Sequence, residues 1–177
     1  MEGLPQSGSP DPVAAVSKLI ESGLDVNGRA RENGFTILHF AALHGNADVV
    51  SLLLERGADP NAVDEEGCTA LMIASEKGYL DVMCLLIDFG ADLEAQGDDG
   101  SALTWAAMIG NADSVHLLLE RGADPRAPDQ TGRTALDRAK LERDSAWHHK
   151  YQAPGSGETG DSVTSECNVV GAYIRNT

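Results

Sequence analysis

Apolar and polar positions follow a pattern that returns along most of the chain every 32 or 33 residues. The run Leu52–Asp59 (LLLERGAD) is matched by Leu85–Asp92 (LLIDFGAD) and by Leu117–Asp124 (LLLERGAD). A second run, Gly34–Ala42 (GFTILHFAA), is matched 33 residues later by Gly67–Ser75 (GCTALMIAS). A period of this length predicts stacked helical units that share one elongated core, not a globule built around a pocket.

Each unit carries start and stop signals for two short helices. A hydroxyl residue that can accept a hydrogen bond from a free backbone N–H precedes the first helix, at Thr36, Thr69, Ser101 and Thr134. In the first full unit we expect one helix between Thr36 and Gly45 and a second between Asn46 and Gly57. Asn46 and Asn111 are expected to cap second helices, and the leucines of these helices to form the core between units.

The pattern G-x-T-x-L-H-x-A-A-x-x-G, followed by LLL-x-x-G-A-D, is similar to the ankyrin repeat, a short β-hairpin followed by two antiparallel helices. The resemblance covers about residues 12–142 and implies an all-α solenoid of stacked repeats. The chain departs from the family pattern where a proline usually follows the capping threonine, and the usual histidine survives only as His39. The third copy is one residue short in its hairpin, near residues 97–100.

The repeats divide the chain into three parts. We predict a disordered N-terminus over residues 1–11, an ankyrin repeat domain over residues 12–147, and a flexible tail over residues 148–177. Within the domain we predict a half-repeat, three full repeats and a capping fragment, over residues 12–30, 31–63, 64–96, 97–128 and 129–147. The tail segment 167–175 is more apolar than a linker requires, which is compatible with a short peptide motif or with a frayed terminus.

The net charge of the chain limits the kinds of molecule that it can bind. The chain has 28 acidic and 13 basic residues, a formal charge of −15, which argues against sequence-independent binding of nucleic acid or of anionic membranes. No apolar run approaches the roughly 18 residues of a membrane span, and residues 1–5 lack the features of a signal peptide. The three cysteines are odd in number and widely spaced, which favours reduced thiols and a cytoplasmic or nuclear protein.

Catalytic chemistry is not indicated. The resemblance assigns His39 to a structural network with Thr36 rather than to a catalytic base. Cys68 falls at an exposed position of the predicted hairpin, where we expect an ordinary thiol. No nucleophile motif, phosphate-binding glycine loop or metal-ligand spacing is present, so we predict no catalytic residues, no cofactor and no metal.

The resemblance also implies a binding face, a concave groove formed by the hairpin tips and the inner side of the first helices. Carried over position by position, the predicted partner-binding residues are Phe35, Leu43, His44, Glu65, Glu66, Glu76, Lys77, Asp98, Asp99, Met108, Ile109 and Arg133. We expect Phe35, Leu43, Met108 and Ile109 to form an apolar floor between acidic tips. Such a face fits a partner segment with basic and apolar residues, although the acid could simply keep the chain soluble.

We therefore predict a monomeric, non-catalytic protein–protein interaction module or adaptor. The alternatives are a regulatory subunit of an enzyme complex, a degradation adaptor and, against the charge, a nucleic-acid-binding adaptor. The context of Asn61 and Asn27, each with an aspartate two residues before, resembles the substrates of an asparaginyl hydroxylase. The alternative is that these asparagines only shape the hairpin turn.

Overall fold

The computed structural model describes the backbone of residues 11–144 and the side chains of residues 11–141. The helices of this part of the chain are α1 (Pro12–Glu21), α2 (Ile37–Leu43), α3 (Ala47–Glu55), α4 (Ala70–Lys77), α5 (Leu80–Asp88), α6 (Ala102–Ile109), α7 (Ala112–Glu120) and α8 (Ala135–Asp144). The predicted tail and nearly all of the predicted disordered N-terminus lie outside these residues. The exact domain boundaries stay a prediction.

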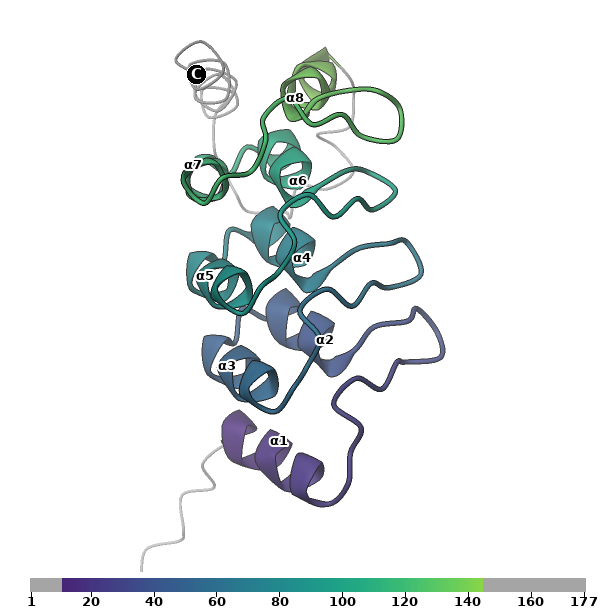
Figure 1. Cartoon of the computed structure of the whole chain (residues 1–177), viewed down its shortest axis with the longest axis vertical. Coiled ribbons are helices and arrows are strands. Elements are labelled where there is room, and N and C mark those ends of the chain that lie inside the picture. Colours follow the sequence, from purple (N-terminus) through teal and green to yellow (C-terminus); the bar gives the residue numbers. More distant parts are fainter. Residues whose placement is uncertain (1–10, 145–177) are drawn as a thin grey trace, which may run out of the picture.

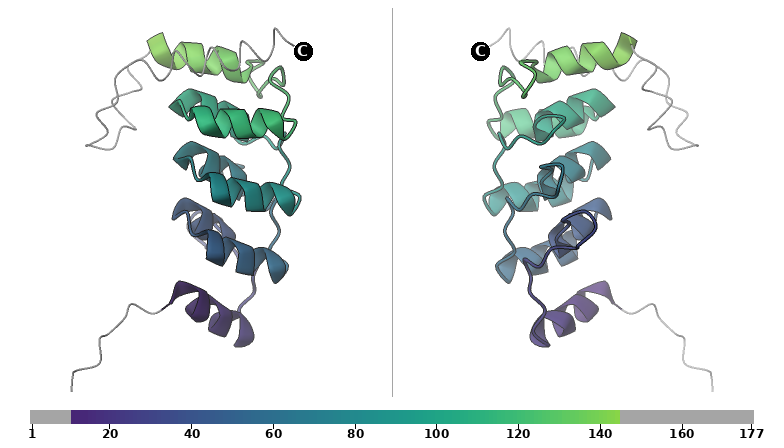
Figure 2. Two further views of the ribbon diagram at one scale, coloured as in Figure 1. Left: turned by 90° about the vertical axis from the view of Figure 1, so that its left-hand side faces the viewer. Right: turned by 90° about the vertical axis from the view of Figure 1, so that its right-hand side faces the viewer.

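The helices are stacked in two columns (Figure 1). The first helices of the repeats, α2, α4 and α6, continue into α8, and the second helices α3, α5 and α7 form the other column with α1 below α3. Views from two sides show the repeats as successive layers of one elongated stack (Figure 2). The loops before the first helices all project on one side, so the all-α repeat solenoid expected from the sequence is confirmed.

The expected β-hairpins are minimal in the described residues. Each is reduced to one isolated antiparallel bridge, namely Arg29 with Thr36, Val63 with Thr69, and Gly97 with Gly100. The tips of the second and third hairpins approach closely, because a Cβ atom added to Gly67 would lie 3.2 Å from the Cα of Gly97. The N–H of Asp98 also donates to the carbonyl of Glu66 at 3.0 Å. Glycine at position 67, where φ is +75°, permits this contact.

Most of the predicted helix caps are present. Hydroxyl oxygens of Thr69, Ser101 and Thr134 accept the N–H three residues later, at 3.3, 3.4 and 3.3 Å. Asn46 likewise caps α3 by accepting from the N–H of Val49 at 3.1 Å. The predicted cap of α7 is wrong. The amide of Asn111 instead donates to the carbonyls of Ser75 and Glu76, so it links the end of α4 to the next repeat.

The hydrophobic core repeats the same arrangement of buried side chains from one repeat to the next. Leu53, Leu86 and Leu118, which occupy the same position in successive second helices, are all fully buried. Small residues of the first helices are buried too, at Ala41, Ala42, Ala74, Ser75, Ala106 and Ala107. Because α2, α4, α6 and α8 each contact the next helix of their column, these alanines set how closely the repeats approach.

Side chains also join each repeat to the next along the exits of the second helices. The amide of Asn27 donates to the Gly57 carbonyl at 3.1 Å and its oxygen accepts the N–H of Asp59 at 2.8 Å. Asn61 makes the same two bonds one repeat later, to Gly90 at 3.1 Å and from Asp92 at 2.7 Å. These asparagines therefore connect neighbouring repeats, beyond shaping their own turns. Their hydroxylation stays a prediction.

The fourth hairpin is tied to α8 by a buried carboxylate. Asp129 accepts hydrogen bonds from the N–H and hydroxyl of Thr131, both at 2.7 Å, and from the N–H of Arg133 at 3.0 Å. Its other oxygen forms an ion pair with Arg138 in α8. Burial alone would raise the pKa of Asp129, but these hydrogen bonds outweigh it and hold the pKa well below its usual range. The capping fragment is therefore attached by charge as well as by its buried Ala135 and Ala139.

Candidate interaction surface

A hollow of about 150 Å³ lies on the side where the hairpins meet the first helices. Three successive repeats line it, through Phe35, Leu43, Asp64, Glu66, Cys68, Met72, Ile73, Glu76 and Trp105. The apolar members come from the first hairpin just before α2, from the end of α2, from α4 and from α6, while the carboxylates come from the second hairpin and the end of α4. The hollow thus combines an apolar wall with an acidic rim.

A buried histidine fixes the wall on the α2 side. His39 is fully buried, and its Nδ1 accepts hydrogen bonds from the N–H of Thr36 at 3.1 Å and from the Thr36 hydroxyl at 2.8 Å. Its Nε2 donates to the carbonyl of Cys68 in the next hairpin at 3.0 Å. The ring of Phe35 stacks on His39 with centroids 5.3 Å apart and meets Phe40 edge-on at 5.2 Å. The structural role that the resemblance implied for His39 fits these contacts.

Burial and the two donors that face Nδ1 keep His39 neutral. Burial lowers its pKa below the usual 6.5, and a second ring proton would have to sit on Nδ1, which faces two donors. Below pH 6.5 the unfolded chain therefore binds more protons than the folded chain. The contribution of His39 to the free energy of unfolding is therefore fully present above pH 6.5. It is lost as the pH falls toward the lowered pKa.

We expect the melting temperature to fall as the pH is lowered from 6.5 to about 5. In this window the carboxylates of Asp129 and Asp137, whose pKa values are lowered, remain ionised. Thermal unfolding followed by circular dichroism measures the effect, and the His39→Gln variant should show a flatter dependence over the same window. Identical slopes in both proteins would contradict the assignment of this pH dependence to His39.

The second hairpin is built around Asp64. This buried carboxylate accepts the N–H groups of Glu66 at 2.9 Å and of Cys68 at 2.8 Å. Cys68 is 9% exposed, so its predicted exposure was wrong: the side chain belongs to the hydrophobic core cluster. Burial, together with the nearby carboxylates, raises the pKa of the Cys68 thiol to about 12. The thiol is therefore protonated and unreactive at neutral pH.

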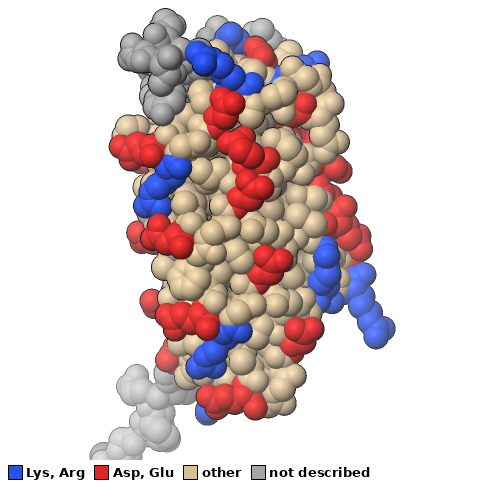
Figure 3. Space-filling model, viewed as in Figure 1, with Lys and Arg blue, Asp and Glu red and all other residues tan. Residues whose placement is uncertain are grey.

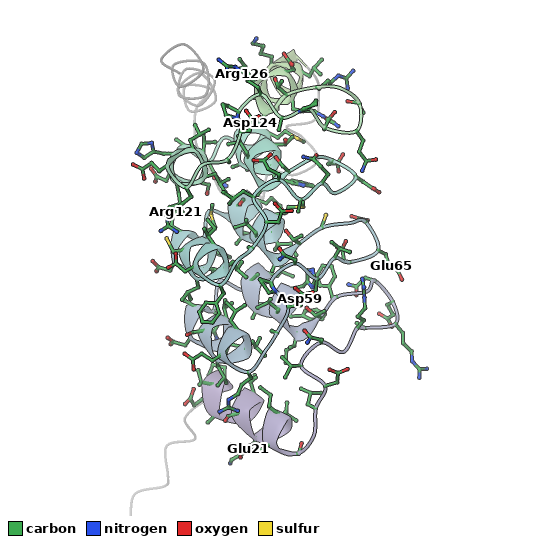
Figure 4. The ribbon with its side chains drawn as sticks, viewed as in Figure 1. Glu21, Asp59, Glu65, Arg121, Asp124 and Arg126 are labelled. Carbon is green, nitrogen blue, oxygen red and sulfur yellow. The ribbon has the colours of Figure 1, made fainter. Side chains whose placement is uncertain are left out.

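Acidic side chains extend from the rim along the hairpin tips. Glu65, Glu66, Asp98 and Asp99 are exposed on the second and third tips, which the contact between Gly67 and Gly97 brings together. Glu65 projects away from the stack at the end of its hairpin (Figure 4). On the face seen in Figure 3, red carboxylates are more widespread than blue side chains, between areas of other residues. A cationic segment approaching this side would be attracted before contact.

The four residues of the predicted apolar floor lie in different environments. Phe35 and Leu43 are half-buried and line the hollow. Met108 is only 4% exposed, so its predicted availability to a partner was wrong. The physical reason is that α6 lies between α4 and α8, and the capping helix extends the stack beyond it. Ile109 is half-buried and does not line the hollow.

The remaining predicted residues spread over a wider surface than the hollow. Glu76 lies on the rim and pairs with Lys77 at 2.8 Å. His44 and Arg133 are exposed, at the end of α2 and in the fourth hairpin. Sequence reasoning missed Met72, Ile73 and Trp105 as lining residues. The sequence signal for Trp105 was its size, because it is larger than Phe40 and Ile73 at the same position of the two preceding repeats.

The described residues offer little else in the way of chemistry. Among them no group of three or more His, Cys, Asp or Glu side chains is arranged to hold a metal ion. Within the same range, no helix has the length and apolar character required to cross a membrane. The surface around the hollow is therefore the candidate site of the described part of the chain.

Comparison with protein-family models decides the family. Residues 7–97 match the model for three copies of ankyrin repeats, and residues 98–130 match that for a further ankyrin repeat. The chain belongs to the ankyrin-repeat family. Stacked ankyrin repeats form protein-interaction modules, and the matched region consists of repeats only.

Ankyrin-repeat relatives of this chain carry very different names. It is 36% identical over 120 residues to the palmitoyltransferase Hip14 of Drosophila melanogaster, a match to 68% of this chain and 14% of that protein. It is 40% identical over 133 residues to the E3 ubiquitin-protein ligase hecd-1 of Caenorhabditis elegans, or 75% of this chain and 4% of the ligase. Ankyrin repeat and SOCS box protein 3 of Bos taurus is 50% identical over 105 residues, covering 58% of this chain and 20% of the relative. The chain thus spans at most a fifth of these relatives.

Proposed function

We propose that this chain is a non-catalytic binding module that holds an extended segment of a partner protein along its hairpins and first helices. An apolar side chain of the partner enters the hollow beside Phe35, Leu43 and Trp105. Basic side chains of the same segment lie against the carboxylates of the second and third hairpin tips. We further propose that the module acts as a monomer in the cytoplasm or nucleus, where its thiols stay reduced.

The observation that supports this proposal most strongly is the position of the hollow. Its apolar wall is built by three repeats, and it opens beside carboxylates such as Glu66, which is exposed and has no ion-pair partner among the described residues. An apolar anchor in a pocket with a charged rim is the usual composition of a specific protein interface. The rim would mainly accelerate and orient the encounter, and the anchor would slow dissociation.

Selection from a random peptide library displayed on phage, with the full chain as bait, tests this proposal. We expect the selected peptides to combine an apolar residue with lysine or arginine. Leu43→Glu in the hollow and the pair Glu65→Lys with Glu66→Lys on the rim should each weaken binding by about tenfold or more, a loss of about 1.4 kcal/mol. Fluorescence anisotropy measures the affinities, and circular dichroism confirms that each variant is folded.

The matched control reverses two exposed charges on the other column of helices. Glu55→Lys at the end of α3 and Glu120→Lys at the end of α7 change the net charge by the same amount as the rim variant. We expect this control to retain nearly all of the affinity. Selected peptides that are acidic, or that bind all the proteins equally well, would exclude the hollow and its rim as the binding site.

A second candidate function is that of an adaptor in protein degradation. The relatives named an E3 ubiquitin-protein ligase and a SOCS box protein favour it over a regulatory subunit of another kind of enzyme. Immunoprecipitation of the full chain from cells, followed by a ubiquitin ligase assay, tests it directly. Ligase activity that is recovered with the wild-type chain would support the function as a degradation adaptor. Absence of that activity would favour the binding module without a role in degradation.

A further inference from the structure

The chain itself contains a segment with the chemistry that the hollow requires. The hollow has an apolar wall, an acidic rim and a volume of about 150 Å³, large enough for a benzene-sized group. Residues 1–10 contain no lysine or arginine, so they do not complement the rim. Two stretches beyond α8 combine aromatic with basic residues, namely residues 147–151 (WHHKY) and residues 169–175 (VVGAYIR).

Chain length distinguishes these two stretches. The helices α8, α6 and α4 follow one another in the stack, and packed helices lie about 8–10 Å apart, which places the hollow roughly 20 Å from α8. Trp147 and Tyr151 follow the last residue of α8 by three and seven positions, which gives reaches of about 10 and 23 Å. Tyr173 follows it by 29 positions and has a reach of over 90 Å, roughly 3.3 Å for each residue. Only the second stretch reaches the hollow with slack.

The order of residues in the second stretch also suits the site. In an extended segment the side chains of positions i and i+2 point to the same side, about 7 Å apart. Tyr173 and Arg175 would thus face the stack together, with the ring of tyrosine over the hollow and the guanidinium beside the rim. Glu66 is exposed on that rim and offers the carboxylate for a two-point contact.

We propose that residues 169–175 bind the hollow of their own chain, with Tyr173 beside Phe35, Leu43 and Trp105 and Arg175 against Glu66. This inference rests on the proposed function, because it assigns the same surface a second occupant. A tethered segment has an effective concentration on the order of millimolar, so that even a weak contact fills the site. An external partner must then displace the tail, and its apparent affinity is lower than its intrinsic affinity.

Energy transfer from Trp105 to an acceptor on Cys167 tests the contact in the full chain. Trp147→Phe leaves Trp105 as the only tryptophan, and Cys84→Ser leaves Cys167 as the only accessible thiol, because Cys68 is buried with a pKa of about 12. Labelling Cys167 with a fluorophore that absorbs tryptophan emission then reports how close the tail lies to the hollow. Addition of a peptide selected by phage display should reduce the transfer as the peptide replaces the tail.

Variants of the tail give the decisive comparison. Tyr173→Ala with Arg175→Ala should reduce the transfer by about half or more, because a roughly tenfold weaker contact turns a mostly occupied hollow into a mostly empty one. The control Ser162→Ala with Thr164→Ala should leave the transfer unchanged. Arg175→Glu alone should lower it, and combination with Glu66→Arg should restore it.

Two results would overturn this proposal. Equal transfer in the parent, the control and the Tyr173 variant would show that the tail does not occupy the hollow; if the selected peptides still depend on Leu43, the proposed function stands without it. Loss of transfer only on replacement of residues 148–150 by alanine would assign the hollow to the other stretch. Failure of both the transfer and the peptide experiments would reject the binding surface itself.

Discussion

His39→Ala is expected to lower the free energy of unfolding by about 3 kcal/mol or more, the largest effect of any single truncation in α2. The substitution removes a fully buried ring and leaves a cavity between two repeats. It also removes the partners of the Thr36 N–H and of the Cys68 carbonyl, and buried polar groups without partners are costly. Urea denaturation followed by circular dichroism measures the change.

His44→Ala is the matched control, because it removes the same side chain from the end of the same helix. His44 is exposed, and its ring contacts only the carbonyl of Phe40 among the hydrogen bonds described. We expect a change within about 0.5 kcal/mol. Two variants of equal stability would mean that His39 does not couple the first repeat to the second.

Ala107→Trp should destabilise the stack by about 4 kcal/mol or more, since the side chain is fully buried where α6 packs in its column. Overpacking at this position forces apart repeats whose contacts are only with their neighbours. We expect α8 and the last repeat to unfold before the rest, which hydrogen exchange would detect as a lost block of protection. A melting curve that matches the wild type would refute the packing assigned to Ala107.

The same substitution on the surface provides the comparison. Ala14 is exposed on α1, so Ala14→Trp adds an equal volume without entering the core. We expect its melting temperature to remain close to that of the wild type. If both variants melted early, the effect would belong to tryptophan as a residue and not to the repeat interface.

The parts of this fold that local sequence determines were predictable. The cap at Thr69 depends on residues within one repeat, and the buried position of Leu86 is indicated several times because the same leucine returns in successive repeats. Met108 was wrongly assigned to the exposed floor because its burial depends on α8, which begins 27 residues later. The sequence of one repeat also could not show that Asn111 binds the end of α4 instead of capping α7, since the carbonyls that it binds belong to the preceding repeat.

The candidate site was less predictable than the fold for a similar reason. Its hollow needs side chains from three repeats, and a repeat pattern specifies what the copies share rather than where they differ. Trp105 is one such difference, because Phe40 and Ile73 occupy the same position in the two preceding repeats. Single departures from a repeat are therefore the positions to inspect first for a binding site.

The side-chain bonds between repeats have a consequence for how this protein can change in length. Those of Asn27 and Asn61 reach acceptors and donors 29 to 32 positions ahead, in the next repeat and no further. A whole repeat inserted between two others would bring its own asparagine and its own backbone partners, so the hydrogen bonds on both sides of it could form. An insertion of a few residues within a helix would break the register of every contact around it. Duplication or loss of complete units is thus the step by which this architecture can lengthen or shorten while remaining folded.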